Sequence, residues 1–325
     1  SARSDDIGVF VVRGTAAVSA AAATAAENGI VGGDIGIAGF LGSKSVTTAA
    51  NDSAREAAKE INNFASLTGV NAMARTQVIL KDVNAAGNIS IEIGKNGEVS
   101  TSTATGDNTA VSAVKINATL TDEDDLTALR DAINAQSGTT GVTASFFEGK
   151  INEILLTDHD GDDIVLSQFQ SLGGANTVVI QAMDYFGETT AGISDETLTH
   201  GASNSTTIRG ELILTSSKSF ATDKHINNDF FGASTTGKAS MEYLNDIDIG
   251  DSVGAEKALH IIDGAINQIN SQRTSLGAVS NRLDSVINNL TNVVENTSAS
   301  ESHIRDANFA QETSKLTKAQ ILNQA

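Results

Sequence analysis

Several residue types are missing, or nearly so, from this chain of 325 residues. It contains no cysteine, proline or tryptophan, and aromatic residues make up only 4% of it. The absence of cysteine excludes disulfides and thiolate metal sites. No apolar run approaches the roughly eighteen residues of a membrane-spanning helix, so the sequence predicts no membrane insertion. The rest, 40% hydrophobic and rich in small residues, is typical of a folded protein with β-rich domains and closely packed helices.

The charge is strongly of one sign. The chain has 21 Lys and Arg residues against 40 Asp and Glu, a formal net charge of −19 at pH 7. This charge disfavours a polyanionic partner, and we expect no nucleic acid to bind. The first residues, SARSDDIGVF, lack the basic and apolar regions of a secretory signal. An extracellular location would therefore require another export route, or the chain is a fragment.

Signals for catalysis and cofactors are also missing. The sequence has no HExxH zinc motif, no Gly-rich phosphate loop and no GxSxG elbow. The five histidines are scattered along the chain: His159, His200, His225, His260 and His303. We therefore predict that the protein is not an enzyme and holds no cofactor.

An acidic turn is the one weak candidate for a metal site. Asp158, Asp160 and Asp162 alternate in TDHDGDDIVL, as the first oxygen ligands of a calcium loop do. The sixth position of such a loop requires glycine and is Asp163, and the twelfth requires glutamate and is Phe169. The sequence therefore favours an ordinary acidic turn over a calcium site.

Short strands separated by turns dominate the first three quarters of the chain. Apolar patterns predict strands over residues 7–12, 152–157, 163–167, 177–181 and 207–215. An Ala-rich run predicts a short helix over residues 16–26, and closely spaced glycines predict turns between residues 29 and 42.

One segment of the chain occurs twice. NDSAREAAKEINNFASLTGVNAMA, residues 51–74, realigns on EDDLTALRDAINAQSGTTGVTASF, residues 123–146. In each copy the pattern predicts a strand (45–48 or 113–120), an amphipathic helix, and a second strand (70–80 or 142–147). Ala54, Ala57, Ala58 and Ile61 are expected to face inward in the first helix, and Leu126, Leu129 and Ile133 in the second. Asp52 and Asp124 are placed to cap these helices or to meet their positive ends.

In the last quarter of the chain, the spacing of apolar residues changes from every second residue to an average of three and a half residues. Small or apolar residues recur there at steps of four and three: Ala258, Ile262, Ala265, Ile269, Leu276, Val279, Leu283, Val286, Leu290 and Val293. About five heptads with this spacing predict a coiled-coil helix, which would extend roughly 50 to 60 Å. Residues 1–250 offer no comparable heptad run, so we predict that the partner of this seam lies outside the chain.

This C-terminal quarter resembles the C-terminal region of bacterial flagellins, the subunits of the flagellar filament. The resemblance rests on AINQINSQR at 265–273, LGAV at 276–279, NRL at 281–283, NL at 289–290, IRDANFAQE at 304–312 and QILNQA at 320–325. The repeat, with its Ile-Asn and Thr-Gly-Val strings, resembles the IN motif of the outer part of flagellins and hook-associated proteins.

The resemblance implies a structural filament subunit that self-assembles through helical core packing and serves swimming motility. It implies an extracellular location in the bacterial flagellum. The implied partners are other flagellin subunits, the flagellar export machinery, an export chaperone, the cap, and a Toll-like innate receptor that recognises the core. Flagellins also have a long N-terminal helical region and a last C-terminal helix, and neither occurs here. The chain is therefore expected to be a fragment that does not form filaments by itself.

The predicted fold class is α+β: β-rich outer domains with two strand–helix–strand repeat modules, followed by a long C-terminal coiled-coil-type helix. The predicted division is 1–42, the β-rich start of the outer region; 43–108 and 109–170, the two IN-type modules; 171–247, the β-rich remainder; and 248–325, the helical core arm. Arg273, Arg282 and Arg305 lie off the seam, where solubility, pairing of Glu301 with Arg305, and lateral contacts between subunits all stay open. Two alternative functions stay open as well: a surface adhesin or glycan-binding module on a flagellin-like stalk, and a hook–filament junction protein.

Overall fold

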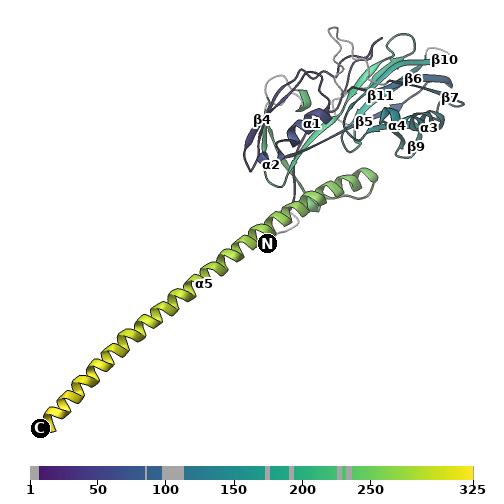
Figure 1. Cartoon of the computed structure of the whole chain (residues 1–325). Helices are drawn as coiled ribbons and strands as arrows, with labels where there is room; N and C mark the ends of the chain where they lie inside the picture. Colours follow the sequence, from purple (N-terminus) through teal and green to yellow (C-terminus); the bar gives the residue numbers. More distant parts are fainter. Residues whose placement is uncertain are drawn as a thin grey trace. The chain divides into compact units, whose positions relative to one another are not determined.

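The computed structural model describes residues 7–84, 86–96, 113–172, 176–189, 194–224, 229–231 and 236–324 (Figure 1). His225 and residues 97–108 of the first predicted module lie outside the described residues. Contacts divide the chain into Ser1–Gln268 and Ile269–Ala325, which we call the strand unit and the helical unit. The long predicted helix is present as α5 (Ser252–Gln324), whose first turns belong to the strand unit. The α+β class is confirmed.

The strand unit is built on antiparallel sheets. The largest has the order β12-β11-β5-β14-β1-β17, with β9 also paired to β5 and β8 paired to β9. A second sheet has the order β2-β13-β10-β6-β7, and a third the order β16-β15-β3-β4. The strands are β1 Gly8–Arg13, β2 Ala17–Val18, β3 Gly33–Ala38, β4 Ser43–Thr48, β5 Asn71–Lys81, β6 Gly87–Asn96, β7 Val114–Leu120, β8 Thr143–Phe147, β9 Lys150–Asp158, β10 Asp163–Leu172, β11 Thr177–Met183, β12 Glu196–Thr199, β13 Thr206–Arg209, β14 Glu211–Ser216, β15 Ala221–Lys224, β16 Thr236–Lys238 and β17 Ser240–Tyr243.

The short helices of the strand unit follow two of these strands. They are α1 Ala54–Asn62 and α2 Ala65–Thr68 after β4, and α3 Thr127–Ala135 and α4 Ser137–Thr140 after β7; two 3-10 helices lie at Asp229–Phe231 and Leu244–Asp246. The residues predicted to face inward are buried in both α1 and the α3 segment. The two helices cover separate cores, since α1 packs with residues of β3, β4 and β14, and α3 packs with residues of β6, β9 and β10.

The helix starts differ by one residue from the prediction. Ser53, rather than Asp52, caps α1 in a capping box: its Oγ accepts the Glu56 N–H at 3.3 Å, and Glu56 Oε2 accepts the Ser53 N–H at 3.2 Å. Ser53 is the cap because its hydroxyl and the carboxylate of Glu56, three residues later, each accept one of the free N–H groups at the start of the helix. At α3 the carboxylate of Asp125, rather than Asp124, accepts the Thr127 N–H at 2.9 Å.

Each short helix pair ends in the same way. Gly69 and Gly141 have φ values of +75° and +68°, a left-handed conformation that glycine adopts without a steric penalty. The hydroxyls of Thr68 and Thr140 donate to the carbonyls of Phe64 and Gln136, both at 3.1 Å. The Thr-Gly-Val string thus encodes the turn from helix to strand in both segments.

Two predictions in the strand unit are wrong. The run at residues 16–26 is not a helix, because β2 pairs with β13 and Ala22 forms a bridge with Ser205. Backbone pairing with a distant strand thus overrides the helix propensity of alanine. The single strand predicted over 207–215 is two strands interrupted at Gly210, since β13 belongs to the second sheet and β14 to the largest one.

Candidate functional site

The apolar seam of α5 is exposed over most of its length. Seven predicted seam residues belong to the helical unit, with exposed fractions between 38% and 69%: Ile269, Leu276, Val279, Leu283, Val286, Leu290 and Val293. Ile287 and Val294, one position after seam residues, are also exposed and widen the stripe. The strict heptad spacing does not include these two residues. A helix face this apolar is the feature that a partner helix buries.

The first turns of α5 behave differently from the rest of the seam. Ala258 and Ala265 are only 4% and 3% exposed, whereas Ile262 is 38% exposed. Ile261, which the heptad pattern does not include, is buried in a core cluster with Val9 of β1. The prediction that the whole seam finds its partner outside the chain is therefore wrong for these turns. In these turns α5 packs against strand β1 of the same chain. The helix face buried there is slightly rotated from the heptad seam.

Ion pairs and hydrogen bonds hold this part of α5 on the strand unit. The guanidinium of Arg75 in β5 pairs with Glu256, and Lys257 Nζ lies 2.6 Å from Glu188 Oε2. At the other end of the contact, Gln268 Oε1 accepts the N–H of Gly8 at 3.0 Å. Polar contacts therefore bracket the buried alanines.

An alanine at Gly264 is expected to weaken this contact. The added Cβ would lie 2.5 Å from Val9 Cβ and 2.9 Å from Val9 Cγ2, so β1 or the helix must shift, at a cost of about 1–3 kcal/mol. Gly277 lies in the same helix with no such neighbour within 4 Å, and Gly277→Ala should stabilise the helix by about 1 kcal/mol. Thermal unfolding of both variants measures the difference. Equal stabilisation by the two substitutions would contradict the contact at Gly264.

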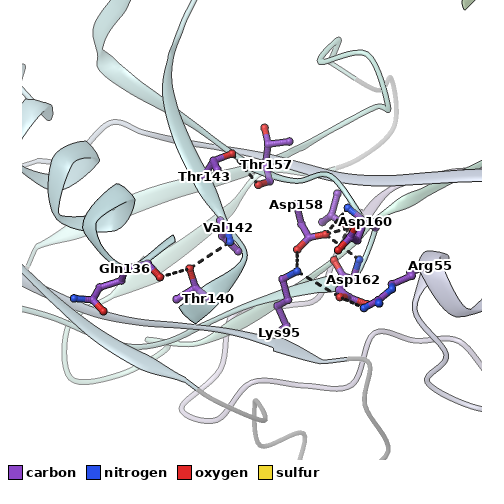
Figure 2. A network of polar contacts seen from close by, with 12 residues as sticks. Arg55, Lys95, Gln136, Thr140, Val142, Thr143, Thr157, Asp158, Asp160 and Asp162 are labelled. Atoms are coloured by element: carbon purple, nitrogen blue, oxygen red, sulfur yellow. Dashed lines mark hydrogen bonds and ion pairs between the residues drawn. The ribbon is translucent and has the colours of Figure 1, made fainter. Parts of the chain in front are cut away.

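The acidic turn after β9 carries the second predicted site, and Figure 2 shows its side chains. Asp158 is fully buried and Asp162 is 4% exposed, whereas Asp160 is exposed. The oxygens of these three carboxylates approach one another closely enough to surround a metal ion. The three aspartates that alternate in the sequence therefore lie close together in the structure.

This turn already contains cationic side chains of the protein. The ammonium of Lys95 in β6 pairs with Asp158 and lies 3.4 Å from Asp162 Oδ2 (Figure 2). Arg55 of α1 contacts the same Asp162 oxygen at 2.8 Å. Burial alone would lower the pKa of Lys95, but hydrogen bonds and the charges of Asp158 and Asp162 outweigh it and raise that pKa. The charge of Asp162 likewise raises the pKa of Arg55.

The second oxygen of Asp158 is also engaged. Its Oδ1 accepts the N–H groups of Asp160 and Gly161 at 2.9 Å and that of Asp162 at 3.3 Å. This oxygen shapes the turn and has little remaining capacity for an ion. The arrangement therefore works as an ion-pair network that ties α1, β6 and the β9–β10 turn together.

Comparisons with known proteins identify two regions of the chain. Residues 259–325 match the bacterial flagellin C-terminal helical region, and residues 88–157 match the flagellin hook IN motif. In these two regions the chain is similar to bacterial flagellins. It is 30% identical to the B-type flagellin of Pseudomonas aeruginosa over 200 residues, which cover 61% of this chain and 40% of that protein. It is 41% identical to flagellin B of Vibrio cholerae over 112 residues, which cover 33% of this chain and 30% of that protein.

The chain thus spans less than half the length of these curated flagellins. Among solved structures, the crystal structure of the flagellar cap protein FliD D1-D2-D3 domains from Escherichia coli aligns at 15% identity. That alignment covers 85% of this chain and 67% of the cap protein chain, with a TM-score of 0.20.

The remaining predicted residues lie apart from one another within the part of the chain that the structure describes. Arg305 lies 3.7 Å from Glu301, but both side chains are more than two thirds exposed, so this pair contributes little to stability. Arg273 and Arg282 are exposed and have no ion-pair partner within the described residues. The imidazole of His260 is half-buried beside Phe186, and burial lowers its pKa. His200 Nδ1 accepts the N–H of Ser171 at 3.2 Å.

No membrane-spanning helix is found among the described residues, since none of their helices combines the length and apolar character that a span requires.

Proposed function

We propose that this chain is a structural subunit of the bacterial flagellar filament, which self-assembles through α5 and serves swimming motility. The observation that carries the proposal is the exposed apolar stripe of the helical unit, inside the segment that matches the flagellin C-terminal helical region. Burying one Leu or Val side chain fully is worth about 1.5–3 kcal/mol, so a stripe of this length favours association strongly. The flagellin family is structural, and polymerisation is the mechanism that this surface supports.

The same proposal assigns a role to each segment of the chain. Residues 248–325 form the helical core arm, and residues 1–247 form the outer region that projects into the medium. Within the outer region, residues 43–108 and 109–170 are two IN-type repeat modules, and residues 1–42 and 171–247 are its β-rich remainder. The matching helix ends at Gly69 and Gly141 support the two modules.

The partners proposed for the protein are those of a flagellin. Other subunits pack against the seam, and Arg273, Arg282 and Arg305 lie on exposed positions that suit lateral contacts. The export machinery, its chaperone and the cap would handle the chain before assembly, and a Toll-like receptor would contact the core. The protein is then extracellular, in the flagellum.

A charge placed in the seam is expected to abolish filament formation. Leu283→Asp puts a carboxylate into the interface, whereas Asn281→Asp adds the same charge two residues away, on the other side of the helix. Because both side chains are exposed, neither change should unfold the subunit. Electron microscopy and swimming assays of bacteria carrying each change in their flagellin gene provide the measurement. Normal filaments with Leu283→Asp would overturn the proposed role of the seam.

A further inference from the structure

Two asparagine side chains make the same pair of hydrogen bonds in two places. Asn62 Oδ1 accepts the N–H of Ala72, and its Nδ2 donates to the carbonyl of the same residue, both at 2.8 Å. Asn134 does the same with Ala144, again with both bonds at 2.8 Å. The primary amide of asparagine has the donor and acceptor of a peptide group, so each side chain pairs with the strand as a neighbouring strand would.

In both places the described residues contain no strand that pairs with this alanine on that side. Ala144 lies opposite Leu156 in the β8–β9 pair, and its N–H and C=O groups point away from β9. Within the described residues β8 pairs only with β9, so this is the outer edge of the sheet. Ala72 pairs with Leu214 of β14 on one side, and Asn62 occupies its other side. There the pairing of β5 with β9 ends at Thr76 and Asp158.

We infer that the amides of Asn62 and Asn134 replace a missing strand, and that at β8 Asn134 closes the sheet edge against a strand from a second copy of this chain. An open edge is a template for pairing with another chain, and proteins block such edges by several devices. Asparagine suits the task because aspartate cannot donate, alanine can do neither, and both polar groups of Ala144 need a partner. This role goes beyond the proposed filament function and does not depend on it.

The two asparagines provide a matched test of this role. Asn62→Ala and Asn134→Ala remove the same two bonds, but only Asn134 borders a strand at the sheet edge. Because the chain has no cysteine, Ser145→Cys on the exposed side of β8 gives a single labelling point. A short bismaleimide cross-linker then reports β8–β8 contact in the full chain, independently of association through α5. Circular dichroism checks that each variant is folded.

Asn134→Ala is expected to raise the yield of cross-linked dimer several-fold over the parent carrying Ser145→Cys, and Asn62→Ala to leave it unchanged. Asn134→Asp should also leave the yield near the parental level, because a charge at an edge opposes strand pairing. Asn134→Ser, whose side chain is too short to reach both atoms, should behave like Asn134→Ala and serves if the alanine variant does not fold. Equal yields from Asn134→Ala, Asn134→Ser and Asn62→Ala would leave the asparagine as a helix-to-strand tether only and overturn the inference.

Discussion

Replacing Lys95 by methionine is expected to destabilise the strand unit by about 3 kcal/mol, although the methylene stem is preserved. Lys95 provides the ammonium that pairs with Asp158 and lies 3.4 Å from Asp162. Both carboxylates are buried, and the other cation of the network, Arg55, makes its ion pair with Asp162. Removing the ammonium leaves the buried charge of Asp158 without an ion-pair partner among the described residues. A buried charge without a partner lowers the free energy of unfolding by far more than the intact ion pair adds to it.

Lys115→Met in the neighbouring strand β7 is the control, since Lys115 is exposed and should tolerate the change within about 0.5 kcal/mol. Urea unfolding of both variants gives the two free energies. The double variant Lys95→Met/Asp158→Asn should be less destabilised than the sum of its two single changes, because the charge that needed Lys95 is also gone. A rise in the melting temperature of the unchanged protein with calcium would contradict Lys95 as the cation of this turn.

The sequence predicts those parts of the fold that local patterns encode. The helix α5, the inward faces of α1 and α3, and the strand positions of β4, β5 and β9 follow from the spacing of apolar residues. The left-handed turns at Gly69 and Gly141 fall on the glycine of each Thr-Gly-Val string, the residue type that commonly ends a helix. These features need no knowledge of distant residues.

Features that depend on distant residues could not be predicted in this way. Strand β6 is an exception: it is not among the predicted strands, although Ile89, Ile91 and Ile93 alternate with polar or small residues as in a half-buried strand. The alanine run at 16–26 reads as a helix until its pairing with β13 is known. The contact of Gly264 with Val9, and that of Lys95 with Asp158, join residues far apart in the chain. The acidic turn was visible in the sequence, but its internal cation was not.

Glu211 is the clearest case of a residue whose environment contradicts its type. A glutamate in a strand ordinarily faces solvent, yet all six residues of β14 are buried, and Glu211 is only 3% exposed. Its Oε2 accepts the N–H of Tyr185 at 2.5 Å. Burial, together with the nearby charge of Asp184, raises the pKa of Glu211 to about 7, against the opposing effects of the Tyr185 hydrogen bond and the charge of Arg13.

This raised pKa predicts a stability that falls as the pH rises. The folded state binds the proton of Glu211 more tightly than the unfolded chain, whose carboxyl titrates near 4.5. The contribution of this group to stability is therefore complete below pH 4.5, and it is lost as the pH rises through about 7. A shift of this size corresponds to about 3 kcal/mol for a buried group. Burial also raises the pKa of Asp163 and Asp184, so their contributions change in the same direction.

Glu211→Gln is expected to match the parent in stability near pH 4.5 and to exceed it by up to about 3 kcal/mol at pH 8. The glutamine keeps an oxygen for the Tyr185 N–H but carries no charge, so nothing is desolvated when the pH rises. Glu123→Gln is the control, because Glu123 is exposed and its removal should leave the pH dependence of the parent unchanged. Urea unfolding from pH 4.5 to 8 measures the three curves. A constant offset between Glu211→Gln and the parent would show that Glu211 is ionised throughout this range, held so by Arg13 in spite of its burial.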